Sequence, residues 1–296
     1  MDMLDLHMHS NISLDGEFSP ERLAELCREH GMKLVSLTDH NSVRGILPFM
    51  EKARECGITV LPGVELDCTC DGLDLHLLGY GIDVTDKRYL EVEEEILEQK
   101  RASSRERMNI LSGLGICFDE EKVLALAHDG IVVGEMIAEA ALADERNMGN
   151  PILEPYRKGG ARGDNPNVNF FWDFCSQGKP AFLPVRYMEV KEAVTLIRDT
   201  GGFSVIAHPA VTVGRREQMI SSILELGASG IEVFSSYHRD EDIRYYRELA
   251  DRYGVLKTAG SDFHGRNKPA VRLGDTNGMT KVDEAEIWEY LDNFRG

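Results

Sequence analysis

Apolar runs of strand length alternate with amphipathic stretches of helical length along the first 81 residues, which is the pattern of strand–helix units. Four apolar runs are expected to be strands, at 4–10, 33–40, 58–66 and 74–81. The stretches between the first three are expected to be helices, at 21–30 and 45–56. Ser19 as N-cap and Pro20 at the first helical position mark the start of the first helix, and Gly31 marks its end.

The pattern changes between about residues 87 and 180, where no run predicts a strand. A long charged helix is expected at 91–115, shorter helices at 120–130 and 135–145, and a Gly/Asn/Pro-rich loop at 158–169. The alternation then resumes, with helices expected at 188–202, 215–230 and 241–254 and strands at 203–209, 231–236 and 255–265.

Repeated strand–helix units predict an α/β fold with a parallel sheet, and about seven of them favour a closed barrel. The simplest architecture is a β/α barrel interrupted by a helical insertion after its fourth strand. The predicted organisation is a first part of the barrel at 1–97, a helical insertion at 98–180 that acts as a lid and sets substrate choice, and a second part of the barrel at 181–296.

The composition narrows the possible partners. Asp and Glu number 51 against 33 Lys and Arg, a formal net charge of −18, so the chain is a poor general binder of duplex DNA. A small anionic substrate remains compatible, because bound cations can reverse the local field. No run approaches the roughly 20 apolar residues of a membrane helix, so no membrane partner is expected. The N-terminal residues carry two acids and no base, unlike a secretory signal, and six scattered cysteines suit free thiols in a cytoplasmic location.

Histidines and carboxylates lie at or near the ends of the expected strands. These residues are His7, His9, Asp39, His40, Glu65, His76, His208, Asp262 and His264. Residues two apart on a strand share a face, so His7 and His9 point the same way. One such pair alone is more often two ordinary polar residues than a ligand pair. The same chemistry at five strand ends, where barrels carry their catalytic groups, predicts one shared metal site, and mixed His/Asp/Glu ligation favours Zn, Mn or Fe.

Six short motifs carry a resemblance to a known family: HMHS, TDHN, GVE, LHLLGYG, AHP and SDFHG, in this order. Together they resemble the PHP (polymerase and histidinol phosphatase) family of metal-dependent phosphoesterases. The resemblance is close over 1–80 and 200–265, and looser from KPAFLP to the helix before AHP. It implies a distorted (β/α)7 barrel with a helical insertion domain, and two or three divalent Mn, Zn or Fe ions at the strand ends.

The same resemblance implies which residues hold each ion. The first ion would take His7, His9, Glu65 and Asp262, the second Glu65, His76 and His208, and the third Asp15, His40 and His264. By itself, Asp15 followed by glycine is also an ordinary turn signal. Asp39 is expected to hold a ligand histidine in place rather than to touch an ion.

A phosphate substrate also needs donors from the protein. Lys179, Arg186 and Arg215 are expected to bind it, with Arg215 favoured over its neighbour, Arg216. His238 is expected either to bind phosphate or to act as general acid, and each of these residues could equally be an ordinary surface or capping residue. Relatives of this type carry G-R-P-H at the start of an insertion helix, where this chain has Val-Gly-Glu-Met at 133–136. The resemblance therefore does not imply that this protein acts on the same substrate as those relatives.

These residues predict a phosphoric ester hydrolase in which a hydroxide that bridges two metal ions attacks phosphorus, with Asp262 and His238 as the catalytic side chains. The expected substrate is a small phosphorylated molecule: a phosphomonoester, a nucleotide or a cyclic phosphodiester. Two alternatives in the same class are a 3′,5′-nucleoside bisphosphate phosphatase and a 5′–3′ exonuclease on short RNA. An alternative of another class is a metal-dependent amidohydrolase, which would have no need of the basic residues. A third class is a non-catalytic accessory domain, in which some of the metal-ligand positions would be expected to hold other residues.

Overall fold

The computed structural model describes residues 3–127 and 129–295. It divides the chain into two compact units, one made of residues 1–93 and 187–296 and the other of residues 94–186. The predicted boundaries of the insertion, 98 and 180, lie inside the second unit. Residue 128, which belongs to a predicted helix of the insertion, lies outside the described residues. The proposal that the insertion acts as a lid stays a prediction.

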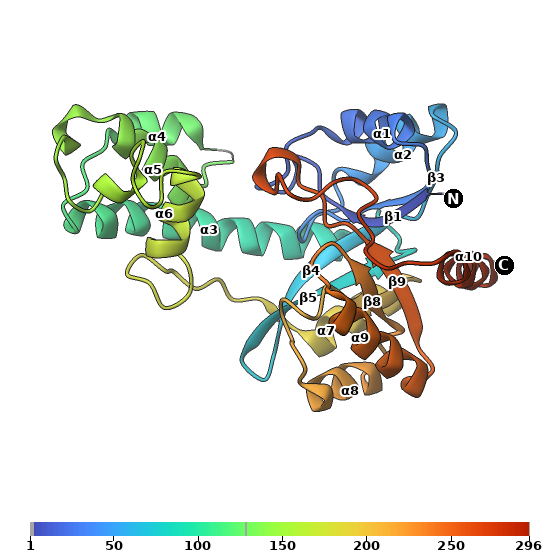
Figure 1. Ribbon diagram of the computed structural model, residues 1–296. Helices are drawn as coiled ribbons and strands as arrows, with labels where there is room; N and C mark the ends of the chain where they lie inside the picture. Colours follow the sequence, from blue (N-terminus) through green and yellow to red (C-terminus); the bar gives the residue numbers. More distant parts are fainter. Residues whose placement is uncertain (1–2, 128, 296) are drawn as a thin grey trace. The chain divides into compact units, whose positions relative to one another are not determined.

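The first unit begins with a parallel sheet of three strands in the order β1-β2-β3 (Figure 1). The strands are β1 (Met3–Met8), β2 (Met32–Leu37) and β3 (Thr59–Val60). The helices that follow the first two strands, α1 (Pro20–Glu29) and α2 (Ile46–Glu55), pack on this sheet and on each other. The predicted signals at α1 are present: the Ser19 hydroxyl accepts the amide N–H of Arg22 at 3.3 Å, and Gly31 has a φ of +76°.

A second sheet has six strands in the order β6-β4-β5-β7-β8-β9. Its strands are β4 (Gly63–Cys70), β5 (Leu73–Tyr80), β6 (Met188–Glu189), β7 (Phe203–Ile206), β8 (Gly230–Ser235) and β9 (Leu256–Gly260). The run 58–66, expected as a single strand, is divided between β3 and β4 across Leu61 and Pro62. Proline lacks the N–H that a strand interior needs, which accounts for the break.

The expectation of a purely parallel sheet is wrong around β5, which pairs antiparallel with both β4 and β7. Asp71 and Gly72 join β4 to β5, and both have positive φ, +50° and +75°. Two such residues form the tight turn whose twist matches a hairpin, so no crossover helix is needed here. The α/β class is confirmed. Isolated bridges, Met8 with Phe263 and His40 with Glu65, link the edges of the two sheets, and the closed (β/α)7 barrel stays a prediction.

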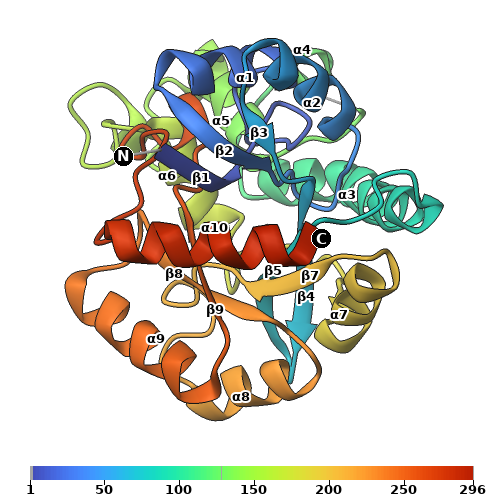
Figure 2. The same ribbon diagram turned by 90° about the vertical axis from the view of Figure 1, so that its right-hand side faces the viewer.

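The remaining helices of this unit lie against the second sheet. They are α7 (Val190–Asp199), α8 (Glu217–Glu225), α9 (Asp240–Tyr253) and α10 (Lys281–Arg295). Figure 2 shows α10, which the sequence pattern did not predict, crossing in front of the strands, and it is in contact with β9. A continuous apolar core includes Leu6 of β1, Leu77 of β5, Ile231 of β8 and Ile287 of α10.

The second unit is helical and has its own core. Its elements are α3 (Lys87–Gly113), which begins in the first unit, α4 (Glu120–Leu126), α5 (Gly134–Ala143), α6 (Pro166–Phe174) and the short 3-10 turns η1 (Glu145–Asn147) and η2 (Glu154–Tyr156). The sequence pattern assigned most of α6 to a loop or to no element. Its core includes Leu111, Ile137 and Phe170. No described helix of the chain is long and apolar enough to cross a membrane, and all six cysteines are free thiols.

Candidate metal centre

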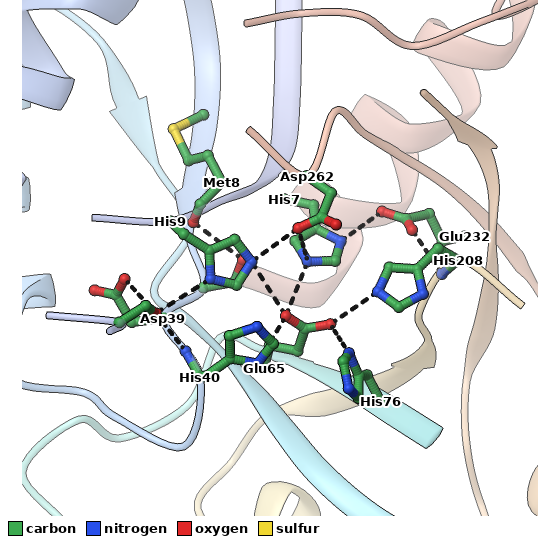
Figure 3. Close-up of polar contacts among 12 residues, drawn as sticks. His7, Met8, His9, Asp39, His40, Glu65, His76, His208, Glu232 and Asp262 are labelled. Atoms are coloured by element: carbon green, nitrogen blue, oxygen red, sulfur yellow. Dashed lines mark hydrogen bonds and ion pairs between the residues drawn. The ribbon is translucent and has the colours of Figure 1, made fainter. Parts of the chain in front are cut away.

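Side chains from β1 and β5 and from the loops after β1, β2, β7 and β9 meet around Glu65 of β4. Figure 3 shows this carboxylate in the middle of a ring of imidazoles that come from β1, β5 and the loops after β2 and β7. All of the residues that the resemblance implies as metal ligands lie in this cluster. They are His7, His9, Asp15, His40, Glu65, His76, His208, Asp262 and His264.

Four of them form the innermost group, which matches the predicted first ion. The Nε2 atom of His7 lies 3.2 Å from Oε2 of Glu65 and 3.3 Å from Oδ1 of Asp262. The Nε2 atom of His9 lies 3.1 Å and 3.0 Å from the same two oxygens. Ligand atoms at about 2.1 Å from a tetrahedral ion are separated by about 3.4 Å from one another. The spacing of these four atoms therefore suits a single cation between them.

The other two predicted ligand sets are also brought together. Oε1 of Glu65 lies 2.8 Å from Nδ1 of His76 and 3.1 Å from Nε2 of His208. Oδ2 of Asp15 lies 3.1 Å from Nε2 of His264 and 3.9 Å from Nε2 of His40. Since the two oxygens of Glu65 face different groups, this carboxylate can bridge two ions.

Buried polar atoms without hydrogen-bond partners show that the cluster fits cations. Among the described residues, no hydrogen bond reaches His7 Nε2, His9 Nε2, Glu65 Oε2, Asp262 Oδ1 or His264 Nε2. An unpartnered buried polar atom costs about 1–3 kcal/mol. Five of them aimed at one another form a donor set of nitrogen and carboxylate oxygen, as Zn, Mn and Fe prefer.

The outer nitrogens of the inner imidazoles are held by other side chains. Nδ1 of His7 lies 3.0 Å from Oε1 of Glu232, whose other oxygen accepts the backbone N–H of His208 at 2.7 Å. Nδ1 of His9 lies 3.2 Å from the hydroxyl of Ser13, which donates to Asp39 at 3.0 Å. The structure thus places Asp39 one hydroxyl away from a ligand histidine. Such contacts fix the ring and leave the inner nitrogen free for a cation.

Two of the ligands stand in strained backbone. His208 has a φ of +22° and Asp262 a φ of +57°, values that are uncommon for residues other than glycine. Strain of this kind costs about 1–3 kcal/mol and tends to persist where a functional geometry requires it. Each residue comes two positions after the end of a strand, where the backbone must turn to direct the side chain into the cluster.

The charges within the cluster stabilise one another. Burial opposes the charged forms of His7 and Glu65, but their attraction outweighs it, so the pKa of His7 is raised well above its ordinary value and the pKa of Glu65 is lowered well below it. Burial is likewise outweighed at His40, where Glu65 and Asp67 raise the pKa to about 10. Burial and the neighbouring His9 lower the pKa of His264 to about 4. Without a cation, the carboxylates therefore retain protons on His7 and His40, whereas the low pKa of His264 leaves that ring neutral at pH 7.

Several residues of the site carry no motif and were missed by sequence reasoning. Glu232 is one polar position inside the apolar strand β8, which was a usable signal. Tyr237 and Lys268 both donate to Oδ2 of Asp262 at 2.7 Å, which leaves Oδ1 of that residue for the cluster. Burial and Asp262 raise the pKa of Tyr237, so the hydroxyl keeps its proton and donates. Asp67 follows Glu65 at the same spacing as His9 follows His7, and that spacing could have identified it.

The predicted phosphate-binding residues are divided between the two units. Lys179 and Arg186 are exposed residues of the second unit. Arg215 lies next to α8, where its guanidinium pairs with Asp242 at 3.1 Å. His238 is buried: its Nδ1 lies 2.8 Å from the carbonyl of Val233, and its Nε2 accepts the N–H of Ala210 at 3.4 Å. Both ring nitrogens of His238 are thus engaged within the protein. The roles of these four residues stay predictions.

Comparison with known proteins agrees with the geometry of the site. A sequence model of the PHP domain matches residues 5–148. Residues 5–148 of the chain therefore carry a PHP domain, as the six motifs suggested. The chain is 27% identical to a 3′,5′-nucleoside bisphosphate phosphatase of Chromobacterium violaceum over 98% of this chain and 96% of that protein. It is also 27% identical to a phosphoribosyl 1,2-cyclic phosphate 1,2-diphosphodiesterase of Eggerthella lenta, over 88% of this chain and 94% of that protein.

A solved structure shares the PHP fold of this chain. The structure, of an amidohydrolase from Chromobacterium violaceum with bound sulfate and no metal, has a TM-score of 0.78 and 24% identity. The match covers 98% of this chain and 96% of that one. The resemblance drawn from the six motifs is confirmed, and it extends through the helical insertion.

Proposed function

We propose that this protein is a metal-dependent hydrolase of small phosphate esters, with a phosphorylated nucleoside as its preferred class of substrate. The observation that carries the proposal is the convergence of buried, unpartnered ligand atoms around Glu65 in a chain that carries a PHP domain. Two relatives that match along most of the chain are named as a nucleoside bisphosphate phosphatase and a cyclic phosphodiesterase. Ester hydrolysis at phosphorus is the reaction that these names share.

Each group of residues has a distinct task in this proposal. His7, His9 and Asp262 hold the first cation, His76 and His208 the second, and Glu65 joins the two. Asp15, His40 and His264 hold a third. When bound, such cations polarise the phosphoryl group and activate water at neutral pH. The mixed nitrogen and oxygen donors favour Mn, Zn or Fe.

A basic side chain, that of Lys268, lies beside the metal centre. Its ammonium group lies against Oδ2 of Asp262, and its side chain is 32% exposed, so it contacts both the cluster and solvent. Tyr237 shares this oxygen and packs edge-on against the ring of His208, at 5.7 Å between ring centroids. Lys268, whose ammonium group has further N–H donors, therefore lies where a phosphoryl oxygen of a bound substrate would need one. This assigns to Lys268 part of the role that sequence reasoning gave to Arg215.

A substrate panel with matched variants tests the proposal. Protein loaded with Mn²⁺ is assayed with p-nitrophenyl phosphate, a nucleoside 3′,5′-bisphosphate, a cyclic phosphodiester, a short RNA and p-nitroacetanilide as an amide. Phosphate esters should be cleaved and the amide should not. His208→Ala should lower turnover at least about 100-fold, since cation contacts supply several kcal/mol of transition-state stabilisation.

His30→Ala is the control for the histidine change, since His30 is exposed at the end of α1 and bonds only to the carbonyl of Leu26. It should retain full activity. Cleavage of the amide but of no phosphate ester, or full activity of His208→Ala, would refute the proposed function.

A further inference from the structure

Asp67 of β4 stands between two of the histidines at the edge of the metal centre. It lies two residues beyond Glu65 and therefore on the same face of the strand. Its Oδ1 atom lies 3.1 Å from Nδ1 of His40 and 3.4 Å from Nε2 of His76. One carboxylate oxygen thus faces two imidazoles that arrive from different elements, the loop after β2 and strand β5.

The opposite nitrogens of these two rings face different parts of the cluster. Nε2 of His40 is directed to Asp15, in the group suited to the third cation. Nδ1 of His76 lies 2.8 Å from Oε1 of Glu65, in the group suited to the second cation. Each histidine therefore has one nitrogen at Asp67 and the other at a separate candidate cation position.

Asp67 is itself held in a fixed orientation. The amide side chain of Asn41 donates to Oδ2 of Asp67 at 2.9 Å, and Oδ1 of Asn41 accepts the backbone N–H of Asp67 at 2.9 Å. Asn41 has a φ of +55°, and its own N–H donates to the carbonyl of Glu65 at 2.7 Å. This double contact engages Oδ2 and directs Oδ1 to the two rings.

We propose that Asp67 is a positioning residue that couples the second and third cation positions by accepting the Nδ1–H of His40 and by pairing with Nε2 of His76. A neutral imidazole carries one N–H, so a carboxylate that accepts it leaves the other nitrogen free as a ligand. Because one oxygen serves both rings, the loss of Asp67 disturbs two cation positions together. The histidines of the first position have no contact with Asp67 among those described, since Glu232 and Ser13 hold their outer nitrogens.

The inference rests on the proposed metal centre and goes beyond it, because it predicts which ions a single carboxylate controls. Metal-free protein and Asp67→Asn are titrated with Co²⁺, with bound metal measured by elemental analysis and by the visible spectrum of each bound ion. Two of the ions should bind about 10–100-fold more weakly in Asp67→Asn, while the first retains its affinity. Asn41→Ala, which keeps the carboxylate but releases it, should weaken the same two ions by a smaller factor.

Asp74→Asn is the matched control. Asp74 is an exposed residue on the neighbouring strand β5, where it accepts from the Thr69 hydroxyl at 3.2 Å, and its loss should leave all affinities unchanged. Equal weakening of every ion, no weakening at all, or complete loss of one ion with the others unchanged would each overturn the role assigned to Asp67. A wild-type protein that binds no Co²⁺ would overturn the metal centre as well, whereas an active, metal-loaded wild type with an unaltered Asp67→Asn would overturn this inference alone.

Discussion

Gly260, the last residue of β9, is where the backbone of one strand approaches the metal centre most closely. A Cβ atom placed on it would lie 2.2 Å from Cβ of His7, 2.9 Å from the backbone nitrogen of His7 and 2.7 Å from Oε1 of Glu232. Contacting carbon atoms are normally about 3.5–4.0 Å apart, so Gly260→Ala requires β9 and β1 to separate by more than about 1 Å. The substitution should therefore disturb stability and metal binding together.

The size of the effect follows from what surrounds the added methyl group. Overpacking a filled core costs about 1–3 kcal/mol. The cost here should be about 3 kcal/mol, because Cβ and N of His7 cannot rotate away from the new group. At about 2–4 °C for each kcal/mol, the metal-free protein should melt about 6–12 °C lower. Displacing Nε2 of His7 by about 1 Å from a bond of about 2.1 Å should also weaken the first cation at least tenfold.

Thermal unfolding followed by circular dichroism measures the first effect, and Co²⁺ titration measures the second. Gly113→Ala in α3 is the control, since no atom lies within 4 Å of the Cβ it would add. That variant should be no less stable than the wild type, because alanine favours a helix over glycine. A Gly260→Ala protein with wild-type melting temperature and wild-type Co²⁺ affinity would show that β9 is not packed against His7 as described.

Three further predictions concern charge at the site. Loading the metal-free protein should release protons at pH 7, because the carboxylates raise the pKa of His40 to about 10 and a cation must displace that proton. Affinity should therefore fall as pH falls, which calorimetry in buffers of different ionisation enthalpy would show. Glu232→Gln should weaken the first cation about 10–100-fold, by replacing an acceptor of the His7 N–H with a group that can also present a donor, and equal affinity in a metal titration would contradict it. Arg215→Ala should change the free energy of unfolding in urea by less than about 1 kcal/mol, because its pair with Asp242 is exposed. Lys268→Ala should raise the KM for a phosphate ester. A raised KM in Arg215→Ala with an unchanged KM in Lys268→Ala would restore Arg215 as the phosphate ligand.

Local periodicity was sufficient to predict most of the helices and strands of the first unit. Ser19, Pro20 and Gly31 act through their own backbone and neighbours, so their effect on α1 needs no tertiary contact. The pattern could not predict that the chain reverses at Asp71 and Gly72 so that β5 pairs antiparallel with β4, because a run of apolar residues does not specify its partner strand. The pattern also missed α10, a helix that packs against β9.

The residues with metal chemistry were all visible in the sequence, because histidines and acids at strand ends are rare enough for their repetition to be informative. What only the tertiary structure decided is which atoms of these residues face one another and what holds them. Glu232 reaches His7 across 225 positions of chain, and Tyr237 and Lys268 reach Asp262 from two separate loops. Such contacts depend on strand order and on the path of loops, which no local pattern encodes. The sequence therefore predicted the candidate ligand set, and the packing of β1, β8 and β9 determined its geometry.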